Sequence, residues 1–248
     1  MKSHGRNMMS TLRETDNYPM PPGEITGPSV WYGPDLERNE MEWLRPFSDE
    51  ELGELDAAMR LVKSMGMDII NITKEKFPLP SLAQVFNSVR KNILRGRGIM
   101  LLRGIPVEDY SIEEIAILYF GIGAHFGMPL PQNAKGHLLG HVKNIGRHEF
   151  DTKSRIYQTN VRQTFHTDAS DIVSLLCLKP AKIGGESAVV SSDTIYNEIL
   201  RRRPDLLPFL FQPYATDWRN ESPSGGEGYY NVPVFSWFLG LTLHCKFD

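Results

Sequence analysis

The chain has 248 residues, of which 41% are hydrophobic, 10% aromatic and 23% charged, as is typical of one globular domain with a sizeable core. Its 27 basic and 30 acidic residues give a formal net charge of −3 without strong segregation, which argues against a nucleic-acid partner or an anionic membrane surface. Two cysteines give no disulfide framework, and no apolar segment reaches the length of a membrane span or a signal-peptide core. We therefore expect a soluble, cytoplasmic protein.

The first 28 residues are polar and rich in proline and glycine. Such a composition disfavours regular structure and is typical of a terminal segment with few contacts. We expect residues 1–28 to form a flexible N-terminal arm and residues 29–248 to form the domain.

Helices are predicted in the first half of the domain. Ser48 with Glu51 and Ser111 with Glu114 have the spacing of a capping box, in which each side chain bonds the other's backbone amide. The first box predicts a helix to residue 65, and the second predicts a helix that ends near residue 123. Residues 81–94 are expected to form a further helix, capped by the serine that opens it.

The pattern then changes to short apolar runs bounded by Gly, Pro, Asn and Asp, which predicts mostly strands. A buried strand is expected at residues 99–102, and later strands are expected at 137–142, 155–160, 171–178, 187–190, 209–214 and 229–238. One helix, at 192–203, interrupts them, with its arginines complementing the carboxyl-terminal dipole. Cys177 lies within an apolar run and is expected to be buried. Helices on a β-rich core favour a jelly-roll-like α+β fold over a parallel βαβ fold.

The tripeptide His166-Thr167-Asp168 is the strongest candidate for a metal site. In a strand, residues i and i+2 face the same side, so an imidazole and a carboxylate can converge on one ion. Two histidines and one carboxylate on Fe(II) leave positions open for a co-substrate and dioxygen. A His-x-Asp pattern also occurs by chance on surface strands, so its context decides the interpretation.

A glycine turn follows the tripeptide, at Gly184-Gly185-Glu186-Ser187. The glycines allow a tight turn, and the hydroxyl can donate to an anion bound beside the metal. His-x-Asp followed by this turn and by the helix at 192–203 resembles the taurine dioxygenase family of Fe(II)/2-oxoglutarate-dependent oxygenases. Residues 95–142 resemble the strand, helix and glycine turn of that family, and the resemblance covers about residues 30 to 248.

The resemblance implies a clavaminate synthase-like double-stranded β-helix, or jelly roll, with N-terminal helices. It also implies Fe(II) as cofactor, 2-oxoglutarate and O2 as co-substrates, and oxidation, usually hydroxylation, of a small organic substrate. His166 and Asp168 would be iron ligands, and Ser187 stands where the family usually has a threonine that contacts 2-oxoglutarate.

Several polar residues have competing interpretations. Asn160, Arg162 and Gln163 lie where such enzymes place substrate contacts, or they form the polar run of an edge strand. The alternative for Ser187 is an ordinary turn hydroxyl, and Asn133 either faces the cleft or caps a turn. A zinc site at His137 and His141 is disfavoured because no glutamate follows the first histidine and Gly140 weakens a helix.

The family also requires a distal histidine and, after it, an arginine that clamps the far carboxylate of 2-oxoglutarate. Downstream of Asp168 the sequence offers only His244, at a separation of 244 − 168 = 76 residues, with Lys246 as the one cation beyond it. We expect an incomplete domain without its C-terminal strands, whose open edges a second copy of the chain could cover in a homo-oligomer. Two alternatives remain: a catalytically impaired family member with a binding role or none, and a cupin-like metal protein with His244 as third ligand.

Overall fold

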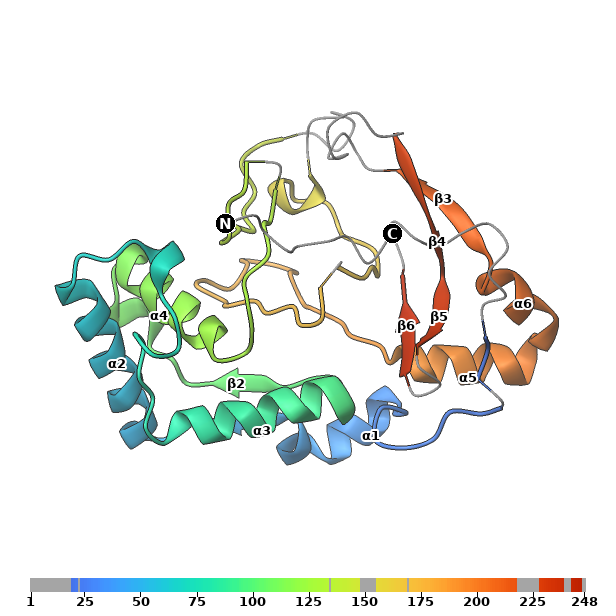
Figure 1. Cartoon of the computed structure of the whole chain (residues 1–248), viewed down its shortest axis with the longest axis horizontal. Coiled ribbons are helices and arrows are strands. Elements are labelled where there is room, and N and C mark those ends of the chain that lie inside the picture. The colour runs from blue at the N-terminus through green and yellow to red at the C-terminus, as the bar shows by residue number, and fades with distance from the viewer. Residues whose placement is uncertain are drawn as a thin grey trace, which may run out of the picture.

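The computed structural model describes residues 19–21, 23–133, 135–147, 155–168, 170–217, 228–238 and 242–246. Its helices are α1 (Gly33–Arg38), α2 (Asp49–Ser64), α3 (Leu82–Arg95), α4 (Ile112–Ala124), α5 (Ser192–Arg202) and α6 (Leu207–Leu210). Its strands are β1 (Leu44–Pro46), β2 (Leu101–Arg103), β3 (Pro213–Asp217), β4 (Tyr229–Pro233), β5 (Phe235–Phe238) and β6 (Thr242–Cys245). Figure 1 shows α2, α3, α4 and β2 at one end, α5, α6 and β3 to β6 at the other, and irregular chain between them. Within the described ranges, no helix has the length and apolar character needed to cross a bilayer.

Both predicted capping boxes are confirmed. Glu51 N donates to Ser48 Oγ at 3.3 Å, and the Glu51 carboxylate accepts from Ser48 N at 3.0 Å. In the second box, Glu114 N donates to Ser111 Oγ at 3.3 Å, and the Glu114 carboxylate accepts from Ser111 N at 2.9 Å. Each box satisfies amides that have no partner within the helix, and this is why α2 and α4 begin where the sequence predicts.

The predicted start of α3 is confirmed, but the predicted cap by Ser81 is wrong. The Ser81 hydroxyl does not accept from the helix. Instead, the Glu54 carboxylate of α2 accepts from the backbone amides of Ser81 and Leu82, both at 3.0 Å. A carboxylate at a helix N-terminus also complements the positive end of the dipole.

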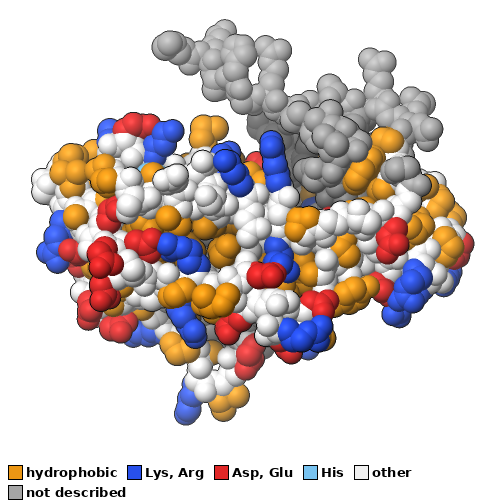
Figure 2. Space-filling view, turned by 90° about the horizontal axis from the view of Figure 1, so that it is seen from below, with side chains coloured by type: hydrophobic (Ala, Val, Ile, Leu, Met, Phe, Trp, Pro, Cys, Tyr) orange, Lys and Arg blue, Asp and Glu red, His pale blue; other side chains and the backbone are white. Residues whose placement is uncertain are grey.

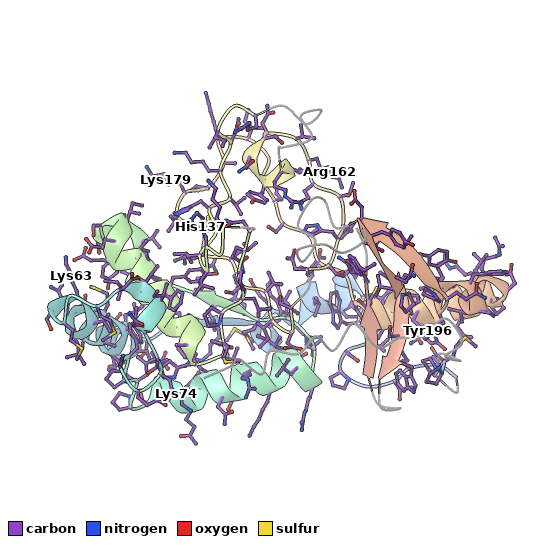
Figure 3. The ribbon with its side chains drawn as sticks, turned by 45° about the horizontal axis from the view of Figure 1, so that its top comes forward. Lys63, Lys74, His137, Arg162, Lys179 and Tyr196 are labelled. Atoms are coloured by element: carbon purple, nitrogen blue, oxygen red, sulfur yellow. The ribbon has the colours of Figure 1, made fainter. Side chains whose placement is uncertain are left out.

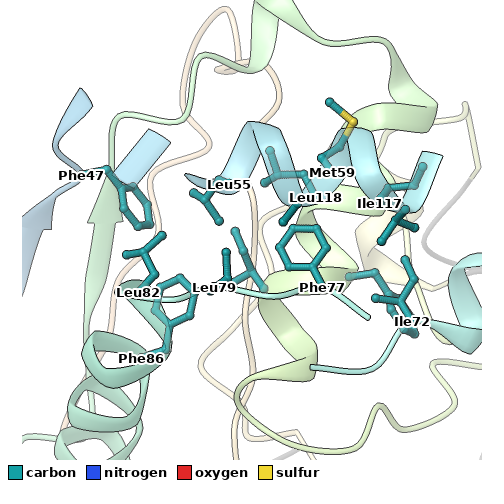
Figure 4. Packing of buried hydrophobic residues seen from close by; sticks show 14 residues of the cluster. Phe47, Leu55, Met59, Ile72, Phe77, Leu79, Leu82, Phe86, Ile117 and Leu118 are labelled. Atoms are coloured by element: carbon teal, nitrogen blue, oxygen red, sulfur yellow. The ribbon is translucent and has the colours of Figure 1, made fainter. Parts of the chain in front are cut away.

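The first core lies between α2, α3, α4 and the loop that joins α2 to α3. Leu55, Met59 and Val62 recur at helical spacing on the buried face of α2. All three belong to one cluster with Phe77, whose ring is fully buried. Figure 4 shows Leu55 and Met59 in this cluster. Each large apolar side chain buried in this way contributes about 1.5–3 kcal/mol, so the helical half has a well-packed core of its own.

The second core is aromatic and lies under α5. The Tyr196 ring meets Phe211 and Phe235 edge to face, with centroids 6.3 and 6.0 Å apart. Leu207 of α6 completes the buried set. This core joins α5 and α6 to the β5–β6 hairpin.

The segment before α1 is tied to α5. Asn197 accepts from Ile25 N at 2.9 Å and donates to Ile25 O at 2.7 Å. Thr194 Oγ1 likewise accepts from Trp31 N and donates to Trp31 O, both at 3.0 Å. The rest of the expected N-terminal arm, residues 1–18 and 22, lies outside the described residues.

The described strands form three two-stranded sheets. β1 and β2 are parallel, with Leu44 opposite Leu101. β3 pairs with β4 and β5 pairs with β6, both antiparallel. The α+β class is confirmed, although these sheets do not close into a jelly roll within the described residues.

Four predicted strands are wrong. Residues 137–142, 155–160, 171–178 and 187–190 are irregular, apart from a 3-10 turn at Ile156–Gln158. A strand persists only when a neighbour completes its ladder of hydrogen bonds, and apolar sequence does not supply that neighbour. The run at 209–214 is also divided, between α6 and β3.

Burial also differs from prediction, both in β2 and in the run at 171–178. Leu101 of β2 is 46% exposed, and Leu175 is 74% exposed. Cys177 is exposed rather than buried. Among the described strands, β2 pairs with β1 alone, and so small a sheet buries few of its side chains.

The described surface mixes both signs of charge. On the face shown in Figure 2, basic and acidic side chains are interspersed, with hydrophobic side chains exposed between them. The three arginines at the end of α5 are paired locally: Arg201 and Arg202 with Glu198, and Arg203 with Asp205. They complement the helix end, as the sequence predicts.

Candidate metal centre

The imidazole of His166 is held in one tautomer. Its Nδ1 lies 2.9 Å from the carbonyl oxygen of Thr164. Because a carbonyl only accepts, Nδ1 carries a hydrogen, and in the neutral ring Nε2 is then the nitrogen with the lone pair. Metal-binding histidines are commonly oriented in this way, with one nitrogen bonded to a carbonyl and the other presented to the ion.

Asp168 lies on the lone-pair side of that imidazole. Its Oδ1 is 3.9 Å from His166 Nε2, and its side chain is about half exposed. Two ligand atoms about 2.1 Å from one ion and at right angles to each other would lie about 3.0 Å apart. The pair therefore fits a divalent ion after a closure of about 1 Å. This proximity arises in irregular chain, since residues 166–168 are not in a strand.

Gln163 also points at the imidazole. Its Nε2 lies 3.1 Å from His166 Nε2, so its amide donates to the lone pair. Asn160 and Arg162 are exposed. Figure 3 shows Arg162 beside the turn Ile156–Gln158, away from Tyr196 and Lys63. Of the three predicted substrate contacts, the structure thus brings only Gln163 to the candidate metal ligands by a hydrogen bond among the described residues.

Backbone bonds fix the chain that leads into the site. Lys143 N donates to Tyr157 O at 3.1 Å, and Ile145 N donates to Gln158 O at 3.0 Å. Thr159 then bridges the turn, since its hydroxyl donates to Ile156 O at 2.8 Å. These bonds tie the segment before His166 to residues 143–145.

The C-terminal hairpin reaches the same segment. Lys246, directly after β6, donates from Nζ to Thr167 O at 3.4 Å, and its backbone N donates to Val234 O at 2.8 Å. Sequence reasoning missed this contact, because nothing in the spacing of Thr167 and Lys246 indicates that they meet. His244 lies in β6 opposite Ser236, but the position of its side chain is outside the described part of the chain.

The glycine turn has the backbone that its sequence requires. Gly184 and Gly185 have φ values of 71° and 82°, a region that residues with a Cβ rarely adopt. Ser187 after the turn is exposed. Within the described residues it makes no hydrogen bond to His166 or Asp168, so its predicted role rests on the sequence pattern.

An apolar hollow of about 290 Å³ is lined by the segments that follow the His-x-Asp tripeptide and the glycine turn. Val173 follows the His-x-Asp tripeptide, Val189 and Val190 follow the glycine turn, and all three face Ile99 and Trp31. Nearby, the hydroxyls of Tyr119 on α4 and Ser174 lie 2.7 Å apart. Burial raises the pKa of Tyr119. The helical half thereby contacts the segment after the candidate metal ligands.

The other polar candidates have structural roles. Asn133 Oδ1 accepts from Lys135 N at 3.0 Å, which confirms the turn-cap interpretation. His137 and His141 lie on irregular chain, so a helical zinc pair is absent there. Across the described ranges, no group of three His, Cys, Asp or Glu side chains is placed to hold a metal.

Comparison with known proteins places these residues in a family. Residues 63–236 match the family described as taurine catabolism dioxygenase TauD, TfdA family. The chain is 30% identical over 224 residues to FR-33289 synthase of Streptomyces rubellomurinus, covering 90% of this chain and 66% of that protein. It is 28% identical over 203 residues to the taurine hydroxylase-like protein SAT17 of Stachybotrys chartarum, covering 79% of this chain and 52% of that protein. The chain therefore spans between about half and two thirds of the length of these relatives. With His166, Asp168 and Ser187 inside the matched region, the chain belongs to the taurine catabolism dioxygenase TauD, TfdA family.

Proposed function

We propose that this protein is an Fe(II)/2-oxoglutarate-dependent oxygenase that oxidises, by hydroxylation, a small organic substrate. The observation that carries the proposal is the family match over residues 63–236, which includes a His166 Nε2 lone pair 3.9 Å from Asp168 Oδ1. The family also supports residues 29–248 as one jelly-roll domain. When bound, iron and 2-oxoglutarate would supply the oxygen-activating chemistry.

The protein's own residues would position these groups. The Thr164 carbonyl orients the His166 ring through Nδ1, which leaves Nε2 to face the ion, and Asp168 would bind the ion through its carboxylate. We propose that the Ser187 hydroxyl donates to a carboxylate of 2-oxoglutarate. We also propose that Asn160, Arg162 and Gln163 contact the substrate. A half-exposed His166 and Asp168 leave a path for ligands from solvent.

The names of the two relatives support a small-molecule substrate. One is a synthase and the other is described as taurine hydroxylase-like. These names favour oxidation of a small organic molecule, in secondary metabolism or in the metabolism of sulfonates or amino acids, over modification of a macromolecule.

The test is an anaerobic titration of the full chain with Fe(II) and 2-oxoglutarate. The chelate of the two gives a weak visible charge-transfer band, which we expect for the wild type and not for Asp168→Ala. Asp171→Ala is the matched control, because Asp171 is an exposed carboxylate three residues further along. A folded wild-type protein without the band would refute the oxygenase proposal and favour a family member with a binding role only.

A further inference from the structure

Trp31, just before α1, is bonded to both halves of the protein. Its indole Nε1 donates to Arg97 O at 2.8 Å, in the loop that follows α3. Its backbone N donates to Thr194 Oγ1 and its carbonyl oxygen accepts from the same hydroxyl, both at 3.0 Å, in the first turn of α5. The residue is buried, and Figure 1 shows α1, which follows it, between α3 and α5. Trp31 therefore joins the helical half to α5.

Trp31 also borders the segments that follow the two motifs. It lines the hollow of about 290 Å³ together with Val173 and Val189. Val173 lies five residues after Asp168, and Val189 lies two residues after Ser187. Because an extended chain advances at most about 3.6 Å per residue, the Cα atoms of the first pair lie within about 18 Å and those of the second within about 7 Å. One buried residue thus stands between the chain after the metal ligands and the chain after the glycine turn.

We propose that Trp31 is a positioning residue, which sets the spacing between the His-x-Asp segment and the glycine-turn segment. The inference rests on the proposed function, in which His166 and Asp168 hold iron and Ser187 holds 2-oxoglutarate. A co-substrate that binds the iron and the Ser187 hydroxyl together needs both segments at one spacing. A misplacement of about 1 Å caused far from the reacting groups can cost about a hundredfold in rate, so a residue that sets this spacing has a measurable effect.

Side-chain contacts matter for the positions of these two segments. Residues 171–178 and 187–190 are irregular. Neighbouring strands are spaced by their ladder of hydrogen bonds, whereas irregular chain is spaced by the side chains packed between its segments. An indole suits this role because it is large and has only two rotatable side-chain bonds. The bond from Nε1 to Arg97 O then fixes the ring against the helical half.

A purely structural role for Trp31 predicts a different result. If Trp31 only joins the two halves, its replacement lowers the free energy of unfolding but leaves the affinity of the folded protein for 2-oxoglutarate unchanged. If Trp31 sets the spacing, that affinity falls. The affinity for iron should change little in either case, because only Thr167 lies between His166 and Asp168. The two affinities together therefore separate the two roles.

The experiment is a pair of anaerobic titrations of the full chain, first with Fe(II), followed by calorimetry, and then with 2-oxoglutarate, followed by the visible charge-transfer band. We expect Trp31→Phe, which keeps an aromatic ring but loses the donor, to bind 2-oxoglutarate about tenfold more weakly and Fe(II) within about twofold of the wild type. Thr194→Val, which releases the Trp31 backbone from α5, should weaken 2-oxoglutarate binding in the same way. Trp43→Phe is the matched control, since Trp43 Nε1 donates to Leu36 O at 2.9 Å and Trp43 is not among the residues that line the hollow.

The outcomes distinguish this inference from the function on which it rests. If the wild type gives the band and Trp31→Phe, folded by circular dichroism, binds 2-oxoglutarate as the wild type does, then Trp31 has a structural role only and the oxygenase proposal stands. An equal loss of both affinities in Trp31→Phe, or the same loss in Trp43→Phe, would likewise overturn the inference. If Trp31→Phe does not fold, Thr194→Val decides between the two roles. A folded wild type that gives no band refutes both proposals.

Discussion

The ammonium group of Lys246 lies 3.4 Å from the carbonyl oxygen of Thr167, the residue between the two proposed iron ligands. These residues are 79 positions apart in the sequence. Lys246 is itself fixed by its backbone bond to Val234, next to β5. The C-terminal hairpin and the candidate metal centre are therefore mechanically linked, although the hairpin's described side chains supply no ligand.

This link predicts a local effect of Lys246→Ala. Loss of the bond to Thr167 should loosen residues 163–168 without unfolding either core, because a bond to a charged donor at this length contributes at most about 1 kcal/mol. Hydrogen–deuterium exchange in that peptide should accelerate up to about fivefold. Lys182→Ala, an exposed lysine near the glycine turn, serves as the control. Equal exchange in the wild type and Lys246→Ala would contradict the link.

Two glycines of α4 predict opposite changes in stability. A Cβ at Gly121 would overlap the buried Phe77 ring, whereas a Cβ at Gly123 has open space around it. Gly121→Ala should therefore lower the free energy of unfolding by about 1–3 kcal/mol through overpacking. Gly123→Ala should raise it by up to about 1 kcal/mol through helix propensity. Urea denaturation of the two variants measures both effects, and equal midpoints would refute this description of the first core.

The capping box of α4 predicts a pH effect. The bond from Lys63, and then those from Ser111, lower the pKa of Glu114 from 4.5 to about 2. A depressed folded-state pKa contributes stability above pH 4.5 that is lost as the pH falls toward 2. The difference in Tm between wild type and Glu114→Gln should therefore be largest near neutrality and should shrink over that interval. Glu113→Gln, in the same helical turn but outside the box, should show little of this dependence.

The two cysteines should differ in reactivity. Cys177 is exposed, whereas burial raises the pKa of the Cys245 thiol to about 11. At pH 8 only about one Cys245 thiol in a thousand is ionised, and the thiolate is the nucleophile. Mass spectrometry after brief treatment with iodoacetamide should find the label on Cys177, and Cys177→Ser should abolish the rapid phase. Rapid labelling of Cys245 in the folded protein would contradict the raised pKa of this partly buried thiol.

Local interactions explain which elements the sequence could predict. Ser48 and Glu51 lie three residues apart and satisfy each other's amides, so no distant part of the chain is needed to begin α2. The run at 171–178 is as apolar as a strand, but its structure depends on a neighbouring strand that its own sequence does not specify. The predicted burial of Cys177 is wrong for the same reason, since burial requires a covering layer.

The same distinction applies to the candidate site. His166 and Asp168 could be paired from their spacing alone, because only Thr167 lies between them and their backbones stay close in any conformation. The contact of Gln163 with His166 Nε2 could not be predicted, because it depends on the irregular path of residues 163–166. A strand would have directed positions 163 and 166 to opposite faces. The approach of Lys246 is a long-range contact that no local pattern encodes.

The paired bonds between Asn197 and Ile25 have a consequence for how the protein is made. They join positions 172 residues apart, so during synthesis the segment around Ile25 leaves the ribosome long before its partner exists. The core of α2, α3 and α4, built from residues 47–122, can assemble meanwhile. Closing so long a loop is slow, and we expect the docking of the N-terminal segment on α5 to be a late step of folding.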